Sequence, residues 1–120
     1  MNKQKGVITL LMAAALASAA TYVLVPRKFD PGEYGYYVDL RVDAGRLGCP
    51  FDAGVYATMQ ATTERLQTWI KYRGSSDANN VAKAAGALLT DAKRGDCPTA
   101  VKNLEAGYDR ILTTLAKGKP

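Results

Sequence analysis

Histidine is absent from this 120-residue chain, and cysteine, phenylalanine and tryptophan are rare, at two, two and one residues. Without histidine the chain cannot build a Ser-His-Asp or Cys-His catalytic arrangement, and it has no ordinary proton shuttle near neutral pH. Two cysteines without histidine also fall short of the four ligands of a structural zinc site. The composition therefore predicts neither a metal nor another cofactor.

Acidic residues are also few, eleven against sixteen basic ones, and they are scattered along the chain. Glu105 and Asp109 stand four residues apart, so a helix would place both on one face. No glycine-rich loop or second motif accompanies them, and we interpret the pair as a solvated helix surface. We expect no catalytic residues and no small-molecule substrate, which leaves a small enzyme as the least favoured alternative.

The N-terminal residues 1–25 predict export. Lys3 and Lys5 precede an uncharged, mostly apolar run over residues 7–25, and the start of that run fits a secretory signal with cleavage between Ala19 and Ala20. As a helix, the run would be nearly as long as the hydrocarbon core of a bilayer is thick, roughly 30 Å. A retained signal-anchor helix is therefore the competing interpretation. Both interpretations place the remaining chain outside the cytoplasm, which in a bacterium means the periplasm. The third alternative is that the apolar run forms a buried helix of a cytosolic protein.

Residues 26–48 predict a tyrosine-rich linker with one candidate strand. From 36 to 43, apolar residues alternate with more polar ones, a period typical of a half-buried extended strand. A single strand would have to pair with a second copy or with the sheet edge of a partner. The alternatives are an irregular linker or a short helix lying on the following domain.

Residues 49–120 predict a small up-down-up three-helix bundle. Apolar residues recur at steps of three and four over about 51–73, 77–94 and 98–117, with glycine after each segment and candidate N-caps before it. The expected fold is therefore all-α: this bundle, preceded by the signal or anchor helix and the short extended tyrosine-rich segment.

Two cysteines stand at corresponding places in this bundle. Cys49 precedes the first predicted helix and Cys97 opens the third, each followed by proline. Because those two helices would run parallel, their N-termini would lie at one end, so a Cys49–Cys97 disulfide is favoured over free thiols, intermolecular bridges or a redox pair. The bridge would close a loop of about 49 residues and contribute roughly 4 kcal/mol in the chain-entropy model. A disulfide also suits an oxidising compartment.

Basic residues gather at the predicted helix ends. Lys71 and Arg73 end the first helix, and Lys117 and Lys119 end the third, where cations offset the helix dipole. In the predicted bundle all four would lie at the end away from the disulfide and form one basic patch. Such a patch could bind an anionic membrane or cell-wall surface, whereas an exported chain is not expected to bind nucleic acid.

The sequence favours a noncatalytic envelope protein that acts by protein–protein interaction, of an accessory, assembly, inhibitor or lysis-regulator type. Its partner would be another envelope protein or a second copy of itself, with the inner membrane as a further contact. Candidate partner-binding residues are tyrosines, which combine contact area with a polar group: Tyr34, Tyr36, Tyr37, Tyr56 and Tyr72. The alternative function is binding of an anionic membrane or cell-wall surface through the basic patch.

Overall fold

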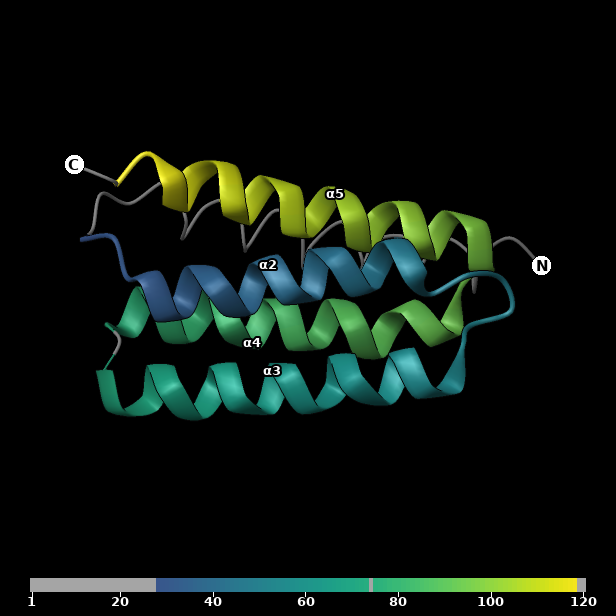
Figure 1. Cartoon of the computed structure of the whole chain (residues 1–120), viewed down its shortest axis with the longest axis horizontal. Helices are drawn as coiled ribbons and strands as arrows, with labels where there is room; N and C mark the ends of the chain where they lie inside the picture. Colours follow the sequence, from purple (N-terminus) through teal and green to yellow (C-terminus); the bar gives the residue numbers. More distant parts are fainter. Residues whose placement is uncertain (1–27, 74, 119–120) are drawn as a thin grey trace, which may run out of the picture.

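Four helices, each antiparallel to the next, form a bundle in the computed structural model, which describes residues 28–73 and 75–118 (Figure 1). The helices are α2 (Pro31–Arg46), α3 (Ala53–Arg73), α4 (Ser76–Asp91) and α5 (Cys97–Ala116), and a short 3-10 turn, η1 (Ala92–Arg94), extends α4. The predicted all-α class is confirmed for this part of the chain.

The three helices expected at about 51–73, 77–94 and 98–117 correspond to α3, to α4 with η1, and to α5. Their starts follow from N-capping: the side chains of Asp52, Ser75 and Asp96 each accept a hydrogen bond from a backbone N–H of the first turn. As expected for consecutive antiparallel helices, α3 and α5 run in the same direction (Figure 1).

The prediction of an extended segment at 36–43 is wrong, because residues 31–46 form helix α2, and the bundle has four helices instead of three. Asp30 caps this helix by accepting from the N–H groups of Gly32 and Glu33, at 2.9 and 3.3 Å. Tyr37, which a strand would place on the polar face, is fully buried, whereas Val42, on the apolar face of that strand, is 47% exposed. Burial therefore follows a step of three or four residues and not of two.

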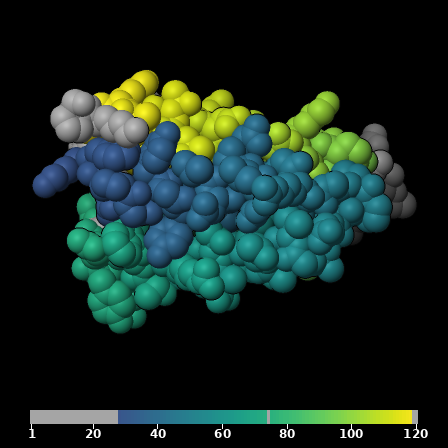
Figure 2. Space-filling view, in the orientation of Figure 1, coloured from purple at the N-terminus to yellow at the C-terminus, as the bar shows by residue number. Residues whose placement is uncertain are grey.

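Helix α2 completes the bundle by packing between α3 and α5. Figure 2 shows it lying across the middle of one face, with α3 on one side and α5 on the other. Helix α4 also packs on both α3 and α5, so these two parallel helices occupy opposite corners of the bundle. Without α2, one long side of the core would be open to solvent.

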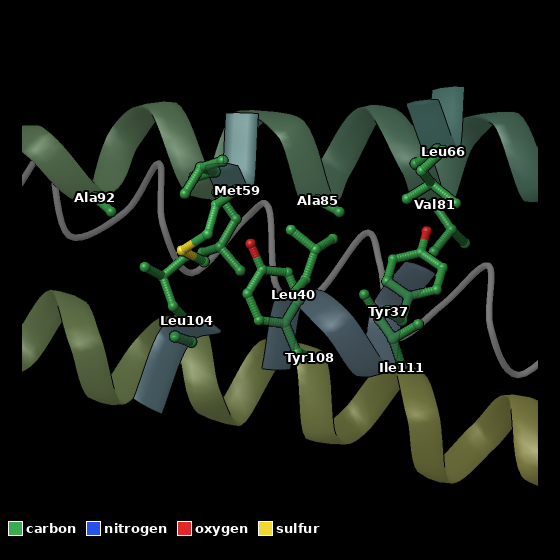
Figure 3. Packing of buried hydrophobic residues seen from close by; sticks show 14 of the residues in the cluster. Tyr37, Leu40, Met59, Leu66, Val81, Ala85, Ala92, Leu104, Tyr108 and Ile111 are labelled. Carbon is green, nitrogen blue, oxygen red and sulfur yellow. The ribbon is translucent and has the colours of Figure 1, made fainter. Parts of the chain in front are cut away.

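The core runs along the axis between the four helices, and side chains from all of them meet there (Figure 3). The residues labelled in Figure 3 are Tyr37 and Leu40 of α2, Met59 and Leu66 of α3, Val81 and Ala85 of α4, Ala92 of η1, and Leu104, Tyr108 and Ile111 of α5. Three of the six residues that α4 buries are alanines, whereas α2 and α5 contribute the rings of Tyr37 and Tyr108.

The two ends of the bundle differ. The disulfide pole contains the α2–α3 loop and the start of α5, where Cys49 and Cys97 are bonded with their Cα atoms 5.7 Å apart, which confirms the predicted bridge. The opposite end, here called the Trp69 pole, holds residues 28–30, the last turns of α3 and α5, and the first turn of α4 (Figure 1).

The predicted export segment lies outside the described residues, and so do its candidate cleavage residues Ala19 and Ala20. Lys119 of the predicted basic patch lies outside them as well. Among the residues that the structure describes, no helix is both long and apolar enough to cross a bilayer.

Candidate functional site

Tyr37 and Tyr56, both proposed from sequence as partner contacts, belong to the core. Tyr37 is fully buried, and Tyr56 is 5% exposed and donates its hydroxyl hydrogen to the carbonyl oxygen of Leu89 at 2.9 Å. The ring of Tyr56 also stacks on Phe51. These two tyrosines were misassigned because a helical α2 turns Tyr37 inward, and because α3 packs Tyr56 against α4.

The other three candidate tyrosines keep exposed surface. Tyr34 is half-buried beside Phe29, with ring centroids 5.3 Å apart. Tyr36 is half-buried and meets the ring of Trp69 edge-on at 6.2 Å, and Tyr72 is 78% exposed. Tyr36 and Tyr72 line one pocket together with Trp69, the only tryptophan in the sequence.

These aromatic residues line a shallow, open groove of about 590 Å³ along the outer side of α3, called here the α2–α3 groove. Its lining residues are Tyr36 from α2 and Ala61, Glu64, Arg65, Thr68, Trp69, Tyr72 and Arg73 from α3. On α3, Arg65, Trp69 and Tyr72 follow one another at helical steps of four and three, which places them on one face of the helix.

Trp69 is held in a fixed position at the end of this groove. Its indole N–H donates to a carboxylate oxygen of Asp30 at 3.0 Å, and its ring lies so close over Gly32 that a methyl group there would overlap it. The guanidinium group of Arg73 lies over the ring, 4.4 Å from its centroid, in cation–π geometry. The start of α2 is thereby attached to the end of α3.

Asp30 is the anionic centre of this arrangement. Burial acts to raise the pKa of its carboxyl group, but hydrogen bonds from Trp69 and from the backbone of Glu33 and Gly32, together with the charge of Arg73, outweigh that effect. The net result is a pKa below the ordinary value. Asp30 is therefore ionised at neutral pH and accepts from both the α2 backbone and the indole.

The described members of the predicted basic patch, Lys71, Arg73 and Lys117, share one pole but do not lie together. Lys71 and Arg73 are exposed at the end of α3, and Lys117 is exposed after the last turn of α5, at the opposite corner of the bundle. Lys28 is exposed at the same pole and lines a small cavity there together with Asp30 and Arg73. The Trp69 pole therefore carries basic residues at two separate corners, one at the end of α3 and one at the end of α5.

The acidic pair on α5 has an ionic partner that the sequence did not suggest. Arg41 of α2 lies 3.1 Å from a carboxylate oxygen of Glu105 and donates a hydrogen bond to Asp109 at 2.8 Å. The pair therefore joins α2 to α5. In residues 28–73 and 75–118 no group of histidine, cysteine, aspartate or glutamate side chains could hold a metal ion.

Sequence reasoning missed the groove, although part of its signal was present. The spacing of Arg65, Trp69 and Tyr72 predicts a shared face on α3, yet Tyr36 joins them only because α2 is a helix packed on α3. Comparisons of the chain with known protein families, with curated proteins and with solved structures find no match. Function must therefore be argued from the chemistry of the site.

Proposed function

We propose that the chain is a noncatalytic exported protein that binds another protein through the α2–α3 groove. The observation that carries this proposal is the grouping of Tyr36, Trp69 and Tyr72 with two arginines, Arg65 and Arg73, in one open groove. Tyrosine, tryptophan and arginine are the residue types that most often dominate binding energy at protein–protein interfaces.

The shape of the groove favours a protein partner over a small molecule. Small-molecule sites usually enclose most of their ligand, whereas this groove is shallow and open along one side. Its α3 residues extend from Ala61 to Arg73, which corresponds to roughly 18 Å of helix. That length suits about three turns of a partner helix or a short extended segment.

The rigidity of the groove supports the same proposal. Trp69 is fixed by Asp30, by Gly32 and by Arg73 before any partner arrives. A side chain that is already ordered loses little conformational entropy on binding, so more of its contact energy appears as affinity.

The proposed location is the cell envelope, free in the periplasm or anchored through residues 7–25. Its supports are the basic start and apolar run of the sequence and the Cys49–Cys97 disulfide, which is typical of oxidising compartments. The partner would accordingly be another envelope protein or a second copy of this chain.

The proposal is tested by a photo-crosslinking amino acid at position 72 of the full chain, expressed in its natural host. A crosslinked partner is expected at position 72 and not at position 102, an exposed site on α5 outside the groove. Affinity for the purified partner then provides the quantitative test. Tyr36→Ser with Arg65→Ser should raise Kd about tenfold or more, as expected for interface hot spots.

A matched control uses the same residue types outside the groove. Tyr34→Ser with Arg110→Ser should leave Kd within about twofold, because neither residue lines the groove. Helical circular dichroism of both double variants must match that of the parent chain. Equal losses from the two double variants, or an unchanged Kd in the folded groove variant, would show that the groove is not the binding site.

A further inference from the structure

We propose that the Trp69 pole faces the membrane and docks on the headgroups of a bilayer that contains anionic lipid. This inference rests on the proposed envelope location; it shares Trp69, Tyr72 and Arg73 with the α2–α3 groove, but not the lysines that its charge variants change. The first observation is the position of Lys28, which lies at this pole and follows the apolar run 7–25 by three residues in the sequence. Three residues reach at most about 11 Å, so an anchor formed by that run would hold this pole, and not the other, against the bilayer.

The second observation is the charge that this pole presents. Its exposed cations are Lys28, Lys71, Arg73 and Lys117. Its acidic residues are less exposed: Glu33 is 2% exposed, Asp30 is half-buried against Trp69, and Asp77 is half-buried in the first turn of α4. The outward-facing charge is therefore positive, and anionic headgroups attract each basic residue that comes near them.

The third observation is the position of the aromatic side chains. Tyr72 is 78% exposed in the last turn of α3, in sequence between Lys71 and Arg73, and Trp69 lies one turn earlier. Tyrosine and tryptophan are enriched where proteins meet the interfacial region of a membrane. The α3 corner thus combines the two residue classes that bind headgroups, and Lys117 adds charge at the opposite corner.

The disulfide pole differs in both respects: its charges are mixed in sign, and its aromatic pair Phe51 and Tyr56 is largely buried. Its exposed cations, Arg46, Lys93 and Arg94, lie among the exposed acids Asp52 and Asp96, and Arg94 is paired with Asp91 at 3.4 Å. Val42, which is 47% exposed one turn before the end of α2, is not an aromatic residue of the kind enriched at membrane interfaces, whereas Tyr72, which is 78% exposed, lies at the Trp69 pole. This difference between the ends selects the Trp69 pole as the membrane-facing one.

The single tryptophan makes the test direct. The full chain is mixed with vesicles of phosphatidylcholine, with or without phosphatidylglycerol, whose acyl chains carry bromine near the headgroup. Quenching of Trp69 emission is expected to be at least twofold stronger in the phosphatidylglycerol vesicles and to fall toward the neutral level at high salt. Equal quenching in both vesicle types, at low and at high salt, would overturn the proposed docking. This holds even if residues 7–25 insert into the vesicles.

Charge variants separate docking from simple tethering. Lys28→Gln, Lys71→Gln and Lys117→Gln together should remove the extra quenching in phosphatidylglycerol vesicles, while Arg46→Gln, Lys93→Gln and Arg94→Gln together should retain it. Equal effects of the two triple variants would overturn the proposal. So would binding to anionic cell-wall polymer without the extra quenching on vesicles.

The outcome is independent of partner binding through the groove. The Tyr36→Ser, Arg65→Ser variant should keep the lipid-dependent quenching, because Lys28, Lys71 and Lys117 are unchanged and do not line the groove. In turn, the variant with three substituted lysines should keep its affinity for the partner. Loss of both activities in either variant, with native helical circular dichroism, would show that lipid docking and partner binding do not depend on separate residues, and would contradict the proposal.

Discussion

The two poles of the bundle are held together by different kinds of interaction. At the disulfide pole, Cys49 in the α2–α3 loop is bonded covalently to Cys97 at the start of α5. At the Trp69 pole, α2 is attached to α3 by the indole of Trp69, which binds Asp30 and packs on Gly32. The difference indicates that one end is closed by a covalent bond, while the other is ordered by a side chain that also lines the α2–α3 groove.

A pair of N-cap aspartates shows the same contrast. Asp96 at the disulfide pole accepts hydrogen bonds only from the backbone and hydroxyl of Thr99, three residues along its own helix. Asp30 caps α2 with one oxygen and binds Trp69 of α3 with the other. A change at Asp96 therefore disturbs one helix start, whereas a change at Asp30 disturbs a contact between two helices.

The largest expected effect is at the disulfide pole. Cys49→Ala with Cys97→Ala should lower the free energy of unfolding by roughly 4 kcal/mol, since the bridge closes a loop of about 49 residues in the unfolded chain. Urea unfolding followed by helical circular dichroism measures this loss, and reduction of the parent chain should reproduce it. Trp69 emission without urea should not change, because its contacts lie at the other pole. A shifted emission would mean that the two poles are coupled.

A smaller effect is expected from Gly32→Ala at the Trp69 pole. The added methyl group would overlap the ring of Trp69, and overpacking of this kind costs about 1–3 kcal/mol. Gly35→Ala is the matched control in the same helix, because a methyl group there meets no atom within 4 Å. Gly35→Ala should stabilise the chain by up to about 1 kcal/mol through helix propensity. Thermal unfolding that moves both variants in the same direction would contradict the tight packing at Gly32.

The predictability of each region depends on how its helices bury their side chains. Helix α5 could be predicted because Leu104, Tyr108, Ile111 and Leu115 repeat a clear apolar spacing. The disulfide then followed from parallel helices. Helix α2 was predicted only as an alternative to a strand, because its buried Tyr37, Leu40 and Ala44 are mixed with partly exposed Tyr36, Val38 and Val42, which imitate a period of two.

The candidate groove was predictable only in part, because it is formed by two helices. Arg65 and Tyr72 share a face of α3 that the helical period alone reveals. The place of Tyr36 depends on the rotation of α2 about its axis, which is set by tertiary packing and by the contact of Asp30 with Trp69. Sequence periodicity carries no information about that contact, since thirty-nine residues separate its two members.

The smallest expected effect, and the most specific one, comes from Asp30→Asn. Asparagine is also a good N-cap, but its single side-chain oxygen cannot cap α2 and accept from Trp69 in the same way as the two oxygens of Asp30. We expect a loss of about 1 kcal/mol at neutral pH, the usual net contribution of one hydrogen bond. The control Asp96→Asn should alter stability without changing Trp69 emission, because the hydrogen bonds of the Asp96 side chain go to Thr99 at the disulfide pole.

The pH dependence of this loss identifies its origin. Because folding lowers the pKa of Asp30, ionised Asp30 stabilises the fold fully above its unfolded-state pKa, and this contribution disappears as the pH falls through the lower folded-state pKa. The difference in unfolding free energy between the parent chain and Asp30→Asn should therefore be constant at neutral pH and shrink below the ordinary carboxyl range. Thermal unfolding over an acid pH series measures it. A difference independent of pH would assign the loss to altered capping geometry and not to the charge that Asp30 presents to Trp69 and Arg73.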